Sequence, residues 1–187
     1  MSAPAATVFT AGHSTRGLDE LLELLSAFGV RRLVDVRRFP GSRRHPQFSR
    51  ERFAPALAAA GIDYRHEENL GGRRRGRPDS PHGAWRVAAF RAYADHMESP
   101  EFQAALARLE DLARERPTVM LCAEAVPWRC HRRLIADALV ARGHEVRHLL
   151  GPGRADRHEL HPDAVVLPGG HLAYPSPADR QSPLPLG

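Results

Sequence analysis

The sequence predicts a single-domain α/β protein with a mainly parallel sheet of about five strands flanked by helices. Short runs of apolar and β-branched residues alternate along the chain with longer segments in which apolar residues recur at helical spacing. The chain has 187 residues, 42% of them hydrophobic, which suits one domain with a core of its own. Alternation of this kind is typical of a parallel sheet with helices on its faces.

Each element has its own signal in the sequence. Residues 17–28 carry apolar side chains at positions 18, 21, 22, 25 and 28, and Gly29 follows as a helix end. Residues 99–115 begin with Ser99-Pro100, a pair typical of a helix start. We expect strands over residues 7–11, 31–36, 62–66, 118–122 and 145–150, and helices over residues 17–28, 49–60, 85–96, 99–115 and 129–142. We assign residues 1–174 to the domain and residues 175–187, rich in Pro and Ser, to a disordered tail.

The charge of the chain is basic and unevenly distributed. The net charge is +5, and all 27 basic residues are Arg. Thirteen of them lie between Arg31 and Arg77, against five acidic residues, which predicts a surface for phosphate or carboxylate groups. A solvated face encoded by a GC-rich genome is the plainer interpretation. The chain begins without a signal-peptide pattern, and no apolar run approaches the roughly 18 residues of a membrane helix, so we expect a cytoplasmic protein with reduced thiols.

The stretch from Thr118 to Arg133, TVMLCAEAVPWRCHRR, holds the densest group of reactive side chains. An uncharged strand ends at Cys122, and the helix predicted to follow Pro127 places Cys130 in its first turn. Free backbone N–H groups and the helix dipole favour thiolate over thiol there. His131 is suited to proton transfer. The predicted catalytic residues are therefore Cys130, Cys122, His131 and Glu124.

The two cysteines allow three interpretations. In the first, one of the cysteines is a catalytic or redox-active thiol. In the second, both are buried and unreactive. In the third, the two cysteines bind a metal ion. The metal interpretation is the least favoured, because Cys-x7-Cys-His lacks the short C-x2-C spacing of typical zinc sites. We therefore predict no metal and no cofactor.

Polar residues also follow two other predicted strands. His13 and Ser14 precede a helix N-terminus, which is a suitable place for an anion. Asp35 and Arg37 end the second strand, and Asp35 is more simply a carboxylate that orients an arginine than a catalytic acid. Because ligands of open parallel sheets bind outside the carboxyl ends of the strands, we expect all these groups within about 12 Å of a common point. The predicted substrate-binding residues are His13, Ser14, Asp35, Arg37, Arg38, Ser42 and Arg132.

Six stretches of the chain form a recognisable combination. They are GHST at 12–15, VDVRRFPGSRRHPQFSR at 34–50, LGG at 70–72, FRAYADHM at 90–97, LCAEAVPWRCHRRLIADAL at 121–139 and VRHLLGPGRADRHEL at 146–160. Together they resemble domain-of-unknown-function family 488 (DUF488), over Thr7 to about Tyr174. The resemblance implies a single α/β domain, and some members carry a DNA-repair label. It implies polar site positions at His13, Ser14, Asp35, Arg37, Pro40, Ser42, Cys122, Glu124, Cys130, His131, Arg132 and His158.

These observations lead us to expect a cysteine-dependent enzyme that acts on a nucleic acid or a phosphate-bearing nucleotide, in DNA repair or nucleic-acid modification. One alternative is a non-catalytic nucleic-acid-binding module, in which only the arginines matter. The other is a dithiol redox or metal-binding protein. The expected partner is a phosphate-bearing substrate such as DNA or RNA, with no membrane partner, and the sequence does not specify the oligomeric state.

Overall fold

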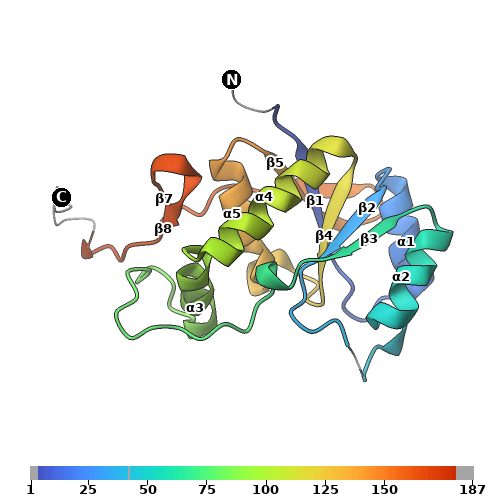
Figure 1. Cartoon of the computed structure of the whole chain (residues 1–187), viewed down its shortest axis with the longest axis horizontal. Helices are drawn as coiled ribbons and strands as arrows, with labels where there is room; N and C mark the ends of the chain where they lie inside the picture. The colour runs from blue at the N-terminus through green and yellow to red at the C-terminus, as the bar shows by residue number, and fades with distance from the viewer. Residues whose placement is uncertain (1–3, 42, 180–187) are drawn as a thin grey trace.

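A six-stranded sheet in the order β3-β2-β4-β1-β5-β6 forms the centre of the computed structural model, which describes residues 4–41 and 43–179 (Figure 1). The strands of this sheet are β1 (Thr7–Gly12), β2 (Arg32–Asp35), β3 (Asp63–His66), β4 (Thr118–Cys122), β5 (Glu145–Gly151) and β6 (Arg154–Arg157). The helices are α1 (Leu18–Ala27), α2 (Arg50–Ala59), α3 (Ala88–Met97), α4 (Pro100–Glu115) and α5 (Arg132–Ala141). A separate two-stranded ribbon pairs β7 (Val165–Val166) with β8 (Leu172–Ala173). The predicted α/β class is confirmed, with one strand more than expected in the main sheet.

The pairing of the strands brings three of their ends to one edge of the sheet. β1 pairs in parallel with β4 and β5, and β2 pairs in parallel with β3 and β4. In this register Gly12 lies opposite Cys122, and Asp35 lies opposite Leu121. The carboxyl ends of β1, β2 and β4 therefore open side by side, as the alternation of strands and helices predicted.

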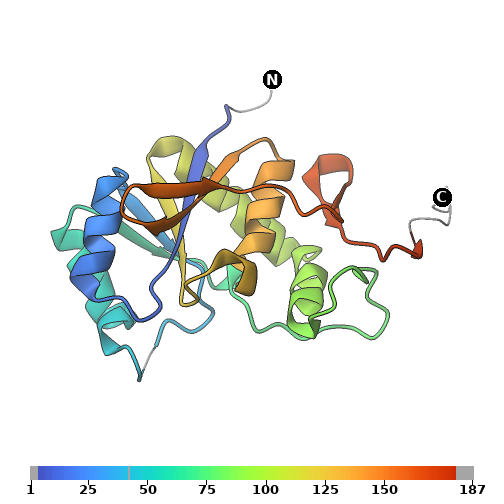
Figure 2. The same cartoon turned by 180° about the vertical axis from the view of Figure 1, so that it is seen from behind.

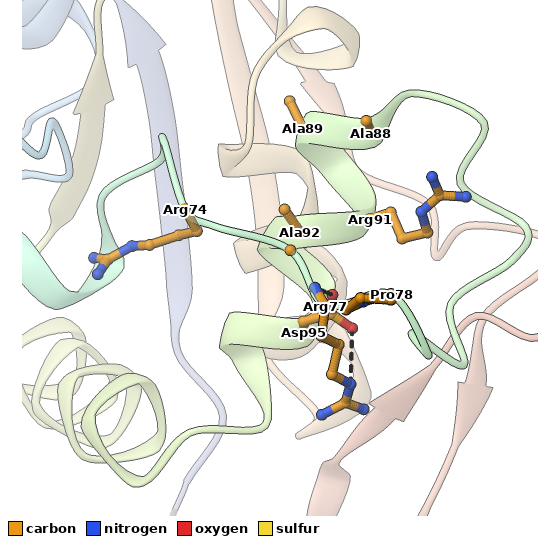
Figure 3. A pocket seen from close by; sticks show the side chains of 9 residues that line it. Arg74, Arg77, Pro78, Ala88, Ala89, Arg91, Ala92 and Asp95 are labelled. Atoms are coloured by element: carbon orange, nitrogen blue, oxygen red, sulfur yellow. Dashed lines mark hydrogen bonds and ion pairs between the residues drawn. The ribbon is translucent and has the colours of Figure 1, made fainter.

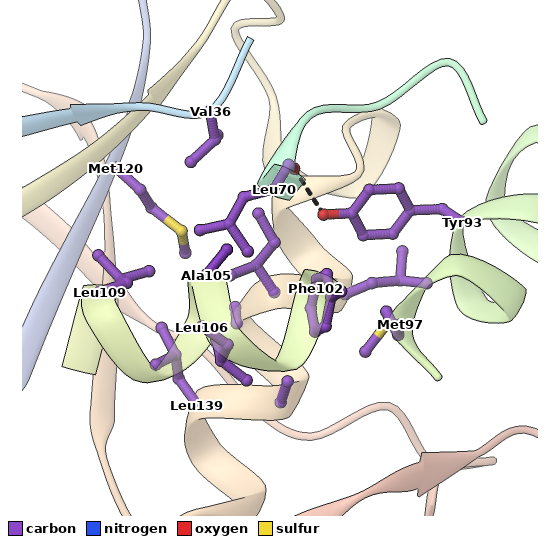
Figure 4. Packing of buried hydrophobic residues seen from close by; sticks show 14 of the residues in the cluster. Val36, Leu70, Tyr93, Met97, Phe102, Ala105, Leu106, Leu109, Met120 and Leu139 are labelled. Atoms are coloured by element: carbon purple, nitrogen blue, oxygen red, sulfur yellow. Dashed lines mark hydrogen bonds between the residues drawn. The ribbon is translucent and has the colours of Figure 1, made fainter. Parts of the chain in front are cut away.

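Helices cover both faces of the sheet because successive strand residues point to opposite sides. Leu33 and Val119 pack with α1 and α2, whereas Val34 and Met120 belong to the cluster under α3, α4 and α5. Figures 1 and 2 show α1 and α2 on one side of the sheet and the other three helices on the opposite side. The cluster under α4 and α5 is the larger of the two, and Figure 4 shows Leu106, Leu109 and Leu139 packed within it.

The sequence prediction missed the sixth strand and misplaced two helix starts. We expected the chain to end its last strand at Gly151-Pro152-Gly153. Instead Gly153, with φ of +68°, turns the chain back into the charged strand β6, which pairs antiparallel with β5. Helix α3 begins at Ala88 rather than residue 85, where the Trp85 ring is buried in the core.

The helix after β4 also begins later than expected, which changes the setting of Cys130. A 3-10 turn over Pro127–Arg129 precedes it, and the Cys130 N–H donates to the Pro127 carbonyl at 3.0 Å. Cys130 is extended, with φ of −124° and ψ of 143°, and α5 starts only at Arg132. The prediction that Cys130 lies in the first helical turn is therefore wrong.

Polar contacts attach the long segment before α3, residues 71–87, to the rest of the domain. His82 is buried, its Nε2 lies 2.8 Å from Glu98 and its Nδ1 accepts the N–H of the fully buried Tyr174. Of the expected tail, residues 175–179 form a turn closed by Ser176 and Asp179, and residues 180–187 lie outside the described residues. Across residues 4–41 and 43–179, no helix combines the length and the apolar character that crossing a membrane requires.

Candidate thiol–imidazole site

The backbone joins the ends of β1 and β4 directly beneath the site. The His13 N–H donates to the Cys122 carbonyl at 3.0 Å, and the Ser14 N–H donates to the Ala123 carbonyl at 2.8 Å. Gly12 makes this approach possible, because a Cβ atom there would lie 1.8 Å from the Glu124 carbonyl oxygen. The expected GHST turn thus needs its glycine for close packing between strand ends.

Two thiols and one imidazole converge at this edge. The Nδ1 atom of His131 lies 3.9 Å from the Sγ atom of Cys122 and 3.8 Å from that of Cys130. Both cysteines are free and buried, with exposed fractions of 8% and 3%. The other ring nitrogen of His131, Nε2, lies 3.1 Å from the carbonyl oxygen of Val36. Because a carbonyl only accepts, Nε2 carries the proton of this bond and Nδ1 faces the sulfur atoms.

The two thiols differ in acidity. A hydrogen bond from Cys130, the interaction of the thiolate with His131 and the nearby Arg132 charge hold the pKa of Cys122 well below its usual value although burial raises it. Burial and the neighbouring Cys122 sulfur raise the pKa of Cys130. The expectation that Cys130 is the acidic thiol is wrong, since Cys130 lies outside the helix and donates a hydrogen bond to Cys122.

Asp35 and Arg37 form a buried pair beside the thiols. Nε and Nη2 of Arg37 donate to the two Asp35 oxygens at 2.9 and 2.6 Å, and the Tyr64 hydroxyl donates to Asp35 at 2.8 Å. The Phe48 carbonyl accepts a further bond from Nη2 at 2.9 Å. Asp35 therefore orients an arginine, as predicted, while Arg37 is committed to the protein's own acceptors instead of facing solvent.

His13 is buried against this pair. Its ring stacks on Phe48 with centroids 4.3 Å apart, and its Nε2 lies 3.5 Å from Nη1 of Arg37. Burial lowers the pKa of His13, so the ring is neutral at physiological pH. His13 thus connects the Asp35–Arg37 pair to the end of β1 and, through its N–H, to Cys122.

Arg132 and Glu124 interact through the backbone. The guanidinium of Arg132 is 1% exposed and donates to the carbonyl oxygens of Glu124 and Ala125. The side chain of Glu124 is exposed, so it is the Glu124 carbonyl and not its carboxylate that joins the site. Both residues shape the turn after β4.

Two further predicted ligands, Ser14 and Arg38, are half-buried. Ser14 is half-buried with φ of +47°, and Ser42 lies outside the described residues. Arg38 donates to the Arg73 carbonyl at 2.7 Å and lies over the Phe39 ring. Arg43, Arg44 and Arg73 are exposed.

Two residues that the sequence did not single out contact the imidazole. The ring of Tyr93 lies 5.0 Å from that of His131, and its hydroxyl donates to the Leu70 carbonyl at 2.6 Å. A Cβ atom on Gly72 would lie 2.9 Å from Nδ1 of His131. The LGG motif was the available signal, because a glycine pair often marks close backbone approach.

A pocket of about 340 Å³ lies elsewhere, between residues 74–78 and α3. Figure 3 shows its alanine floor, with Arg77 paired to Asp95 and Arg74 directed away. None of the thiol or imidazole groups lines this pocket. Because the thiols and the imidazole lie at the carboxyl ends of the strands, we take that edge of the sheet, and not this pocket, as the candidate site.

The fold and the site together define an α/β domain with a thiol–imidazole centre at the carboxyl ends of parallel strands. A family model described as "Domain of unknown function DUF488" matches residues 17–139, which is more than half of the chain, and the protein belongs to this family. The match includes both cysteines and His131, and it leaves out the GHST turn and residues 146–160. Searches of curated proteins and of solved structures found no match to the chain.

Proposed function

We propose that the protein is a cysteine-dependent enzyme that acts on a nucleic acid or a phosphate-bearing nucleotide, with Cys122 as its nucleophile. The observation that supports this most strongly is the approach of His131 Nδ1 to Cys122, with Nε2 held by the Val36 carbonyl. A thiol beside an imidazole that a third group orients is the general arrangement of an activated nucleophile.

Each neighbouring group has a distinct part in this proposal. Nδ1 of His131 takes the proton of the Cys122 thiol, and the sulfur bonds to the electrophilic atom of the substrate. The bond between that atom and the departing group breaks, and His131 gives the same proton to the departing group. Cys130 donates a hydrogen bond to the Cys122 sulfur. Arg37 and Arg132 position the strand ends, because their guanidinium groups are already bound within the protein.

The charge around the site supports a phosphate-bearing substrate. No acidic residue lies between Arg37 and Arg50, and Arg43, Arg44 and Arg73 are exposed. The exposed arginines can bind phosphates, and the exposed ring of Phe39 can stack on a base. We place the activity in DNA repair or nucleic-acid modification and in the cytoplasm, where thiols stay reduced.

Protection of Cys122 from alkylation tests the proposal. In chelator-treated protein, iodoacetamide labelling of Cys122 should slow severalfold when single-stranded DNA, RNA or nucleotides are present, because a bound substrate covers the thiol. Labelling of Cys122 at an unchanged rate with all three probes would contradict the proposed substrate class.

A non-catalytic nucleic-acid-binding module is the second candidate, favoured by the exposed arginines alone. Replacing both cysteines by Ser distinguishes the two functions. A binding module keeps its affinity and needs no thiol, whereas the proposed enzyme keeps binding but forms no covalent adduct in intact-mass measurements. Adduct formation with the wild type and Cys130→Ser, but not with Cys122→Ser, would identify the nucleophile.

A further inference from the structure

We propose that Cys122, Cys130 and His131 bind one thiophilic divalent metal ion, with Zn²⁺ as the fitting ion. The two sulfur atoms and Nδ1 of His131 all lie within 4.8 Å of one another. Two thiolates and an imidazole are the ligand types that zinc prefers. This differs from the expectation drawn from sequence spacing, because the strand and the 3-10 turn bring together residues that Cys-x7-Cys-His separates.

The nitrogen–sulfur distances are close to those of a metal centre. Zinc binds sulfur at about 2.3 Å and histidine nitrogen at about 2.0–2.1 Å, so two such ligands of one tetrahedral ion stand about 3.6 Å apart. The observed Nδ1–Sγ distances are 3.8 and 3.9 Å. These distances need to contract by a few tenths of an ångström. The two sulfur atoms lie within 4.8 Å of each other and must approach to about 3.8 Å, a change of up to about 1 Å that side-chain torsions can supply.

The groups behind the ligands are arranged as an outer shell. The Val36 carbonyl accepts the Nε2–H of His131, which leaves the Nδ1 lone pair directed at the sulfur atoms. Metal-bound histidines in proteins almost always donate their other ring N–H to a backbone carbonyl, a carboxylate or a water in this way.

Charge balance also favours an ion. Binding of the ion releases the proton of Cys130, and the divalent cation neutralises two thiolates that would otherwise repel each other in a buried site. Three protein ligands leave one coordination position open. The absent side chain of Gly72, whose Cβ would lie 2.9 Å from Nδ1, leaves room beside the ion for water or an exogenous ligand.

The ion would bind the same sulfur that the proposed enzyme uses as nucleophile, so the loaded and the reactive states exclude each other at Cys122. The inference does not depend on the proposed function, because it concerns direct binding of metal. If the wild-type protein bound no metal, this inference would be wrong, and the proposed enzymatic function would be unaffected. The protection experiment above, made with chelator present, tests the enzyme separately.

Metal titration of the untagged full chain is the test. Chelator-treated protein should take up one Zn²⁺ per chain by native mass spectrometry, and Co²⁺ should give thiolate-to-metal charge-transfer absorption. Cys122→Ser, Cys130→Ser and His131→Gln should each weaken binding more than about 100-fold, beyond the about 10–100-fold cost of losing an outer-shell partner. His96→Gln is the matched control, because His96 is a half-buried imidazole whose Nε2 also binds a backbone carbonyl, at 2.7 Å from Asn69.

A measurement on the wild type keeps the test independent of how the variants fold. Saturating Zn²⁺ should protect both thiols from iodoacetamide, and chelator should restore their labelling. Labelling of both thiols at an unchanged rate under saturating Zn²⁺, or Co²⁺ spectra without a thiolate band, would overturn the proposal. Equal loss of binding in His96→Gln would overturn it as well.

Discussion

The carbonyl oxygen of Val36 accepts a hydrogen bond from Nε2 of His131 at 3.1 Å, across a sequence separation of 95 residues. Val36 directly follows β2, and His131 directly precedes α5. This bond fixes both the ring orientation and the tautomer, so it determines that Nδ1 meets the sulfur of Cys122. The reactivity of the thiol therefore depends on a backbone atom of a neighbouring strand.

Cys122 should be the more readily alkylated thiol. Because hydrogen bonds hold its pKa well below the usual range, its rate of iodoacetamide labelling should reach half-maximum below about pH 8.5, the value for a free thiol. Peptide mass spectrometry of chelator-treated protein across a pH series measures both sites. Faster labelling of Cys130, or a Cys122 midpoint at or above about 8.5, would show that the acidity is assigned to the wrong sulfur.

Gly12→Ala should destabilise the protein. The added Cβ would lie 1.8 Å from the Glu124 carbonyl, so the ends of β1 and β4 must separate, at a cost of about 1–3 kcal/mol as in other overpacked sites. Gly17→Ala is the control, because Gly17 has φ of −67° and no atom within 4 Å of its added Cβ. Urea unfolding gives both values, and equal stability of the two variants would contradict the packing argument.

Binding of single-stranded nucleic acid should depend on the arginines of the 37–50 loop. Replacing Arg43 and Arg44 by Gln should reduce the slope of log Kd against the logarithm of the salt concentration by about 1–2. Each phosphate contact contributes about 0.7–0.9 to this slope. The control replaces Arg31 and Arg116, exposed residues at the amino ends of β2 and β4, and removes the same charge. Equal slopes for both double variants would show that the charge is only compositional.

His148 should make the protein sensitive to acid. Burial, His158 and the charges of Arg132 and Arg133 lower the pKa of His148 to about 3, against 6.5 for a free histidine. The unfolded chain binds the proton first, so stability is full above about pH 6.5 and falls toward pH 3, by up to about 1.4 kcal/mol per pH unit for this group. Chemical denaturation at pH 7, 6 and 5 should show a shallower fall for His148→Asn. If the free energy of unfolding fell equally steeply with pH in the wild type and in His148→Asn, His148 would not be the source of the acid sensitivity.

The parallel part of the fold was predictable because its signals are local. Apolar runs mark the strands and Ser99 caps α4, its hydroxyl accepting the Phe102 N–H at 3.2 Å. The meeting of Cys122, His13 and Asp35 at one edge also followed from the predicted parallel direction of the strands. The charged strand β6 could not be predicted this way, because its pairing depends on β5 rather than on its own residues.

The assignment of side-chain roles required coordinates. From the sequence, Arg37 and Arg132 were expected to bind a substrate phosphate. In the structure both side chains are buried and donate their hydrogen bonds to groups of the protein itself. The acidity of a thiol likewise depends on one turn of chain. Because a 3-10 turn over Pro127–Arg129 replaces the first turn of the expected helix, Cys130 lies outside the helix, and Cys122 is the thiol with the lowered pKa. The contact of Gly72 with His131 joins distant segments, and no spacing rule encodes it.

The bond between Val36 and His131 also has a consequence for how the chain matures. Contacts between residues this far apart carry a large loop-closure entropy and form late in folding. β2 and β4 must be paired, and the turn that carries Cys130 and His131 must be in place, before Cys122 becomes acidic. A partly unfolded chain therefore carries two ordinary thiols, and rapid labelling of Cys122 near neutral pH becomes an indicator that this edge of the sheet has folded.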